Sequence, residues 1–162
     1  MCIRDRLTID RPVEARTLVQ QVTNSPEGQN DPEAWVLLGN AASVLKDRGN
    51  LRLAGARTNA LAPERFEGYF FKAQFHNIES QKTEALSLVD KAIERSGNNT
   101  APFVLKATIL QDLGQWQEAQ KTMASALERN PNDRVAQMFK ATLDQQGNNS
   151  TVTGVSTENG NE

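Results

Sequence analysis

Cysteine is nearly absent from this chain of 162 residues, which contains only Cys2. A lone thiol excludes an internal disulfide framework and a cysteine-rich metal site. Histidine is equally scarce, since only His76 is present, and no Cys, His or paired carboxylate lies at metal-ligand spacing from it. The sequence also lacks a nucleophile–base pair, a phosphate-binding glycine loop and a dinucleotide-binding fingerprint. It therefore predicts no metal, no cofactor and no enzymatic activity.

Long hydrophobic runs and an excess of one charge are missing too. No apolar stretch approaches the roughly 18 residues that a membrane-spanning helix needs. The formal net charge is only −2, with both signs mixed along the chain, which argues against a nucleic-acid partner. Hydrophobic residues make up 38% of the chain. The composition therefore predicts a soluble helical protein, and it indicates no particular compartment.

Residues 1–6 (MCIRDR) look like a translated transposon-end sequencing adapter. A natural start with this sequence is the alternative. We exclude these residues, and Cys2 with them, from the fold prediction as an adapter-like scar. On this interpretation the chain is a fragment of a longer bacterial-type protein whose own N-terminus is missing.

What the sequence does contain is a repeat. Residues 103–131 predict two short amphipathic helices joined by a turn at Gly114 and Gln115. A shift of 34 residues brings similar residues into the same column: Trp35, Tyr69 and Phe103; Lys72, Lys106 and Lys140; Pro63, Gly97 and Pro131. A fixed period with a helix–turn–helix unit is typical of a solenoid.

This pattern resembles the tetratricopeptide repeat, whose period is 34 residues. Residues 35–39 match its W-x-x-L-G opening, and the third repeat has its small, aromatic and proline residues in place: Gly114, Trp116, Ala119, Ala126 and Pro131. The resemblance implies an all-α fold, an α-solenoid of about seven antiparallel helices in pairs that form a tetratricopeptide superhelix. It also implies a protein-binding scaffold rather than an enzyme.

The period divides the chain into segments. We expect the second helix of a partial repeat with its loop at 12–31, complete repeats at 32–65, 66–99 and 100–134, a capping helix at 135–146, and a disordered C-terminal tail at 147–162. In the first complete repeat the turn is expected late, at 47–50, followed by a short helix at 51–61.

Several residues have specific expected roles within these helices. Asp31 is expected to cap the helix that begins at Pro32. Trp35 is expected in the core, and Gly39 where two helices cross closely. The helix at 12–23 is expected to lack the helix that would cover one of its faces, so self-association through that truncated N-terminal face is a possible outcome. That face consists of Leu18, Val19 and Val22.

In tetratricopeptide proteins the first helix of each repeat lines a concave groove, which suggests a peptide-binding site. The corresponding residues are Val36, Asn40 and Ser43; Phe70, Gln74 and Asn77; Val104, Thr108 and Gln111; then Met138, Thr142 and Gln145. The spacing i, i+4, i+7 places each row on one helical face. Each row has one apolar and two uncharged polar groups, which suits an extended peptide rather than a terminal carboxylate. The alternative is a solvated face without a ligand.

The lysine column departs from the family, which usually has an apolar residue there. Lys72, Lys106 and Lys140 form either a basic ladder for an acidic partner or three stems packed on apolar surface with the ammonium groups in water. We favour packing for these lysines, and for His76 as well.

The leading functional hypothesis is a non-catalytic interaction scaffold that binds a peptide or protein segment in the groove. The alternative is a substrate-binding or regulatory part of a larger enzyme or envelope-assembly factor, with its other domain missing upstream. A purely structural oligomerisation module is a third class. The sequence does not identify the partner.

Overall fold

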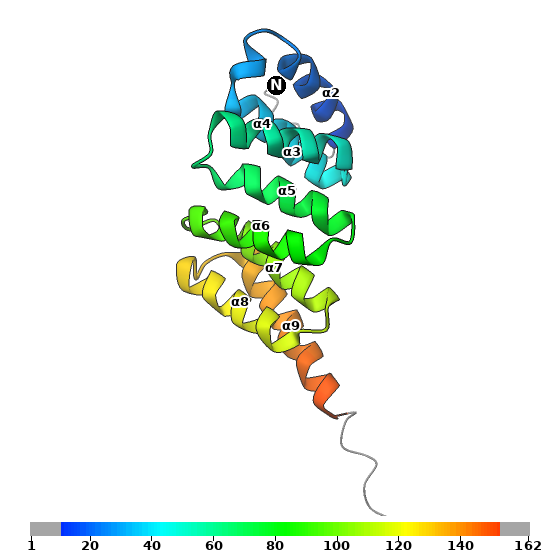
Figure 1. Cartoon of the computed structure of the whole chain (residues 1–162). Helices are drawn as coiled ribbons and strands as arrows, with labels where there is room; N and C mark the ends of the chain where they lie inside the picture. Colours follow the sequence, from blue (N-terminus) through cyan, green and yellow to red (C-terminus); the bar gives the residue numbers. More distant parts are fainter. Residues whose placement is uncertain (1–10, 153–162) are drawn as a thin grey trace, which may run out of the picture. The chain divides into compact units, whose positions relative to one another are not determined.

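The computed structural model describes residues 11–152, and the side chains of residues 11–146. The chain divides into two compact units, residues 1–97 and 98–162. Across the described residues the protein is all-α, with eight α-helices, one short 3₁₀-helix and no strand, against about seven helices predicted (Figure 1). The predicted fold class is therefore confirmed. The adapter-like segment lies outside the described residues.

Unit 1 contains a single helix followed by two helix pairs. Its elements are α2 (Pro12–Thr23), the 3₁₀-helix η1 (Gly28–Asn30), α3 (Pro32–Leu45), α4 (Arg48–Leu61), α5 (Phe66–Ile78) and α6 (Lys82–Arg95). Each α-helix packs on the next one in the chain, and α3 also contacts α5. As predicted, Asp31 caps α3, since its side chain accepts a hydrogen bond of 2.9 Å from the backbone N–H of Glu33.

Unit 2 contains one helix pair and a final helix. Its elements are α7 (Ala101–Asp112), α8 (Trp116–Arg129) and α9 (Arg134–Val152), and α8 packs against both of the others. The prediction ended the last helix at residue 146 and began a disordered tail at 147, whereas α9 continues to Val152. No proline interrupts this segment, so the backbone hydrogen bonds extend into it. The rest of the predicted tail lies outside the described residues.

The turns inside the helix pairs are identical, which corrects one prediction. Lys46, Ser80 and Gly114, spaced by 34 residues, have φ values of 52°, 61° and 72°. After each, a backbone N–H bonds the carbonyl five residues earlier at 2.9 Å: Asp47 to Ala42, Gln81 to His76, Gln115 to Leu110. This is the Schellman ending of a helix. The first turn thus lies at the same place in its repeat as the other two turns, and α4 has the same length as α6 and α8, 14 residues.

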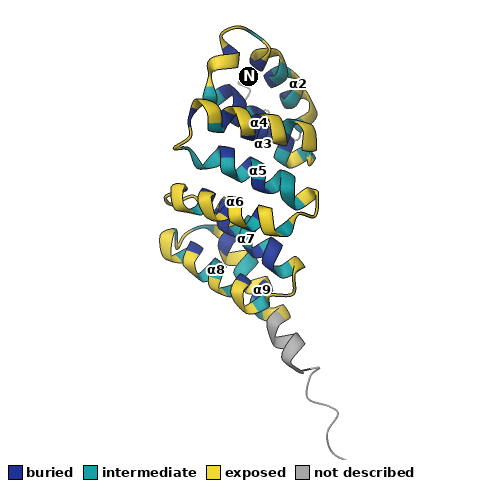
Figure 2. Ribbon diagram, in the orientation of Figure 1, coloured by how far each residue is buried: buried dark blue, intermediate teal, exposed yellow. Residues whose placement is uncertain are grey.

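The core of unit 1 forms where α3 meets its neighbours (Figure 2). Trp35 is buried, as predicted, and clusters with Val19 and Leu38. Gly39 also has its predicted role: a Cβ there would come within 2.2 Å of the Phe71 ring of α5. The covered side of α2 consists of Ala15, Val19 and Thr23. Val19 was expected on an uncovered face, but it packs on α3 because the chain places α2 directly against that helix.

Small residues let the second helices approach their partners. In unit 1, Ala85 and Ala92 of α6 are fully buried, and in unit 2 the same holds for Ala119 and Ala126 of α8. The predicted role of the alanines as close-contact positions is consistent with this burial. No helix within residues 11–152 is long and apolar enough to cross a membrane.

Candidate functional site

In unit 1 the predicted groove residues lie on α3 and α5, two first helices that are in contact. The Ser43 hydroxyl lies 2.9 Å from the Gly39 carbonyl oxygen of its own helix and 2.5 Å from Oε1 of Gln74, and the second contact joins the two helices. Asn40 is exposed, while Phe70 and Asn77 are partly buried. We call this set the α3–α5 face, defined as Asn40, Ser43, Phe70, Gln74 and Asn77.

Val36 does not belong to this face. It is only 5% exposed and packs in the core with Leu51 and Phe71. The prediction placed it at the surface because it shares a helical row with Asn40 and Ser43. The wide apolar stripe of α3, which faces both α4 and α5, extends far enough round the helix to cover it.

A lysine that the sequence analysis missed reaches the α3–α5 face. Nζ of Lys82, at the start of α6, donates a 2.7 Å hydrogen bond to Oδ1 of Asn77. The rows of the first helices contain no cation, so their spacing alone could not reveal one. The position of Lys82 directly after the turn could have indicated this contact, because the Schellman ending at Ser80 places the start of α6 beside the last turn of α5.

In unit 2 the corresponding residues are Val104, Thr108 and Gln111 of α7, all partly buried. Nε2 of Gln111 donates a 2.9 Å hydrogen bond to Oε1 of Gln146 on α9. Met138, on the same helix, is 72% exposed. The hydroxyl of Thr108 donates a hydrogen bond to the carbonyl of Val104 one turn earlier. Its oxygen can still accept a hydrogen bond from a ligand or from water.

The three lysines of the 34-residue column are all partly buried. The stem of Lys72 lies over Gly55 of α4, where a Cβ would meet its Cγ at 2.8 Å. Nζ of Lys140 pairs with Asp144 at 2.7 Å, and Lys106 lies close enough to Glu118 to lower the pKa of that carboxyl, behind the larger effect of Lys121. These contacts support the packing interpretation over an open basic ladder.

The aromatic column has a partner that sequence reasoning missed. A guanidinium group stacks on each ring: Arg57 on Trp35 at 5.5 Å, Arg95 on Tyr69 at 4.6 Å, and Arg129 on Phe103 at 4.8 Å. Arg95 and Arg129 obey the 34-residue period, whereas Arg57 lies one helical turn earlier. Each stack joins the two helices of one pair through a cation–π contact.

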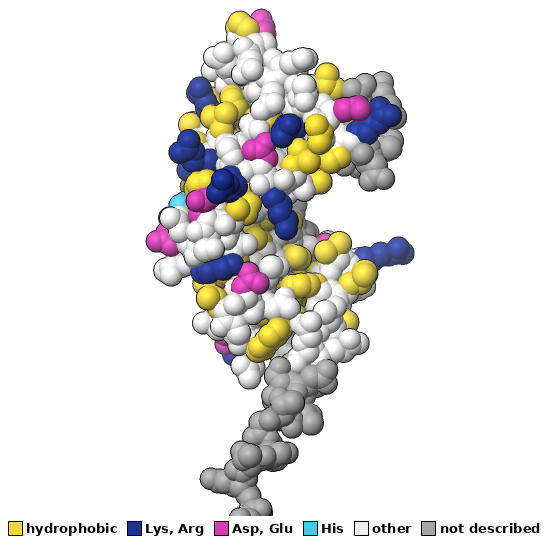
Figure 3. All heavy atoms as spheres, turned by 90° about the vertical axis from the view of Figure 1, so that its right-hand side faces the viewer, with side chains coloured by type: hydrophobic (Ala, Val, Ile, Leu, Met, Phe, Trp, Pro, Cys, Tyr) yellow, Lys and Arg dark blue, Asp and Glu magenta, His cyan; other side chains and the backbone are white. Residues whose placement is uncertain are grey.

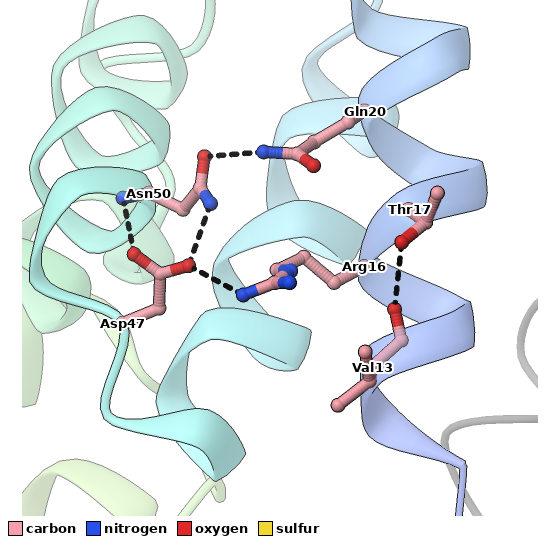
Figure 4. Close-up of polar contacts among 6 residues, drawn as sticks. All are labelled: Val13, Arg16, Thr17, Gln20, Asp47 and Asn50. Carbon is pink, nitrogen blue, oxygen red and sulfur yellow. Dashed lines mark hydrogen bonds and ion pairs between the residues drawn. The ribbon is translucent and has the colours of Figure 1, made fainter.

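Two polar networks fix the helices of unit 1 around this face. Arg65 donates to Glu33 and Glu67, both at 2.8 Å, and the hydrogen bond to Glu67 raises the pKa of Arg65. At the other end, Arg16 of α2 bonds Asp47 at 3.1 Å, and Gln20 bonds Asn50 at 3.2 Å (Figure 4). Burial raises the pKa of Asp47, but hydrogen bonds from Asn50 and Arg16 outweigh it and hold that pKa below its ordinary value.

His76, predicted as a packing residue, is partly buried and contacts its neighbours in the chain. Its ring meets the Phe75 ring edge-on, with centroids 5.2 Å apart. Nδ1 lies 2.6 Å from the Gln81 side chain, which fixes the imidazole beside the α5–α6 turn.

Comparisons with known proteins agree with this architecture. Residues 79–143 match a family model described as tetratricopeptide repeat. Among solved structures, MamA 41-end from Desulfovibrio magneticus RS-1 is similar with a TM-score of 0.64 and 16% identity, over 94% of this chain and 85% of that one. MamA AMB-1 is similar with a TM-score of 0.60 and 20% identity, over 89% and 84%. No curated protein sequence matches the chain significantly.

Helix pairs at a fixed spacing, with small residues at their crossings, define an α-helical repeat protein. The family match and the turn geometry make the class specific: the chain is a tetratricopeptide repeat protein. Proteins of this class are protein-interaction domains and typically non-catalytic scaffolds. At these identities the MamA structures show the fold alone.

Proposed function

We propose that this protein is a non-catalytic scaffold that binds an extended polypeptide segment on its first helices, with the α3–α5 face as the main site. The observation behind the proposal is the Ser43–Gln74 hydrogen bond, which joins two helices beside the partly buried ring of Phe70. The bond fixes the Gln74 side chain before any ligand arrives, which lowers the entropic cost of binding.

The chemistry of the face suits a peptide backbone. Gln74 uses its oxygen for Ser43, and its amide nitrogen has no acceptor among the described residues. Asn40 is exposed and likewise has no hydrogen-bond partner there. These groups can bond the carbonyls and amides of an extended chain, while Phe70 offers a ring on which an apolar side chain can rest. The proposal includes the division into complete repeats at 32–65, 66–99 and 100–134, and it requires no cofactor.

Mutation of the face tests the proposal. Peptides selected from a random display library against the protein should lose about tenfold or more in affinity for a Phe70→Ala, Gln74→Ala double variant, because truncating a buried interface aromatic commonly costs about 2 kcal/mol. The control is Leu53→Ala, Gln21→Ala, which likewise removes one apolar and one amide side chain, from exposed positions on α4 and α2. Fluorescence anisotropy gives the affinities, and circular dichroism checks that both variants stay helical.

Salt dependence distinguishes this site from the lysine column. The α3–α5 face is uncharged except for Lys82 at its end, so affinity should change little between low and physiological salt. A basic ladder predicts the reverse: affinity that falls steeply with salt and with Lys106→Glu. An indifferent Phe70→Ala, Gln74→Ala variant together with a steep salt slope would refute binding on the α3–α5 face.

A further inference from the structure

A cleft lies between α4 and α5, away from the α3–α5 face. The cleft has a volume of about 310 Å³ and is lined by Arg48, Gly49, Arg52, Phe75 and Glu79. Arg48 is the first residue of α4 and Glu79 the C-cap of α5, so the cleft opens where the turns of the two helix pairs lie. Phe75 and Glu79 are on a different side of α5 from Phe70 and Gln74, since they are offset by about 100° per residue around the helix.

The two arginines of the cleft differ in their partners. Nη1 of Arg48 pairs with Oε1 of Glu79 at 2.8 Å. Arg52, one turn further along α4, is exposed and has no hydrogen bond or ion pair with any described residue. The residues that line the cleft thus carry two positive charges and one negative charge, and the guanidinium group of Arg52 has no partner among the described residues. The Asp47 carboxylate beside Gly49 is paired with Arg16 and leaves this balance unchanged. Figure 3 shows this side of the molecule, on which Lys and Arg side chains are mixed with Asp and Glu side chains.

The backbone leaves room in the cleft. Gly49 lies in the first turn of α4, whose N-terminus is capped by the Asp47 carboxylate, which accepts a 3.2 Å hydrogen bond from the backbone N–H of Asn50. A Cβ at this position would meet nothing nearer than the Asp47 carboxylate at 3.6 Å. The glycine therefore leaves open space beside the arginines, and the Phe75 ring provides an apolar wall.

We propose that this cleft binds an acidic side chain, Asp or Glu, of a polypeptide. The Arg52 guanidinium would accept the carboxylate through two parallel hydrogen bonds, the geometry for which arginine is suited. The methylene groups of the acidic residue would rest on Phe75. One uncompensated positive charge matches a carboxylate better than a phosphate group, which carries about −1.5 to −2 at neutral pH. No residue of the α3–α5 face lines the cleft, so this inference stands apart from the function proposed above.

Fluorescence anisotropy with designed probes tests the proposal at low salt. The probe is a fluorescein-labelled peptide of Gly and Ser with three Glu residues, compared with the same peptide carrying Gln or phosphoserine in place of Glu. We expect Arg52→Gln to weaken binding of the Glu peptide about fivefold. Glu79→Gln should strengthen it about threefold, because the variant frees Arg48 and removes a competing carboxylate. The matched control Lys46→Gln, an exposed cation in the adjacent turn, should change it less than about twofold.

The strengthening by Glu79→Gln separates a specific site from misfolding, since an unfolded variant would lose affinity. The proposal is overturned if the Gln peptide binds as tightly as the Glu peptide, or if Glu79→Gln weakens binding. It is also overturned if Lys46→Gln and Arg52→Gln have equal effects, because the attraction would then be diffuse. Tighter binding of the phosphoserine peptide than of the Glu peptide would refute the assignment to a carboxylate.

Discussion

Adding one methyl group at Gly39 should destabilise unit 1, even though alanine is the better helix former. In an exposed helix, Gly→Ala would stabilise by about 1 kcal/mol. At Gly39 the new Cβ would lie 2.2 to 2.5 Å from three atoms of the Phe71 ring, far inside the usual carbon–carbon contact of about 3.5 Å. Phe71 is fully buried, so its ring cannot swing into solvent. Overpacking of this kind costs about 1–3 kcal/mol, and we place Gly39→Ala near the upper end, for a net loss of about 2 kcal/mol.

Gly49→Ala is the matched control, because it makes the same chemical change in the first turn of the next helix. Its Cβ would meet only a carboxylate oxygen at 3.6 Å, so we expect no loss and a gain of about 0.4–1 kcal/mol. Urea unfolding followed by tryptophan fluorescence measures both. A Trp116→Phe background leaves Trp35, in the core of unit 1, as the reporter.

The double variant Gly39→Ala, Phe71→Leu tests the cause. If the clash with the ring is responsible, the smaller leucine should relieve it, and the double variant should lose less stability than the sum of the two single variants by about 0.5 kcal/mol or more. A Gly39→Ala protein as stable as the wild type would refute the reasoning, and strict additivity would place the cost elsewhere.

Two further predictions concern the polar network of α2 and the packing of α8. The pKa of Asp47 is lower in the folded state, so its contribution to stability should be present above the ordinary aspartate pKa of about 3.9 and disappear as the pH falls through the folded-state pKa. The difference in unfolding free energy between wild type and Asp47→Asn, measured by urea unfolding, should therefore shrink from pH 6 to pH 3. A constant difference would contradict this. In unit 2, Ala126→Leu should destabilise the protein by about 1–3 kcal/mol, because Ala126 is fully buried. Ser125→Leu, at an exposed position on the same helix, should change stability by less than about 0.5 kcal/mol. Equal effects in thermal unfolding would mean that the orientation of α8 is wrong.

The sequence predicted those features that depend on periodicity and on single-residue chemistry. The second helices of the three complete pairs begin at residues 48, 82 and 116, and this spacing is visible in the sequence as the 34-residue columns. Asp31 as a cap and Gly39 as a close crossing were predictable because few residue types suit those positions.

The error at the first turn has a physical cause. Glycine marks a left-handed residue in a sequence, since its backbone adopts positive φ without strain. Gly114 was recognised in this way, whereas Lys46 occupies the same conformation with φ at 52°. A lysine there costs about 1–2 kcal/mol, and nothing in its chemistry indicates the turn. The glycine at 49 attracted the prediction instead, although it lies inside α4.

The candidate site was harder to predict than the fold, because the spacing of residues along a helix shows which side of the helix they share but not how deeply each one is buried. Val36, Asn40 and Ser43 share one row, yet the first is buried and the second exposed. The amount of each row that neighbouring helices cover depends on three-dimensional packing. The contacts of Lys82 with Asn77 and of Ser43 with Gln74 join different helices, and no periodicity within one helix contains that information.

The polar bridge from α2 to α4 affects how α2 opens. In a repeat protein stability is approximately a sum of nearest-neighbour terms, so terminal elements tend to open singly. The bonds from Arg16 to Asp47 and from Gln20 to Asn50 connect α2 to a helix that is not its neighbour in the chain. Loss of α2 would remove a cation from the carboxylate that caps α4. The α2 helix and the first complete pair are therefore expected to behave as one foldon in native-state hydrogen exchange.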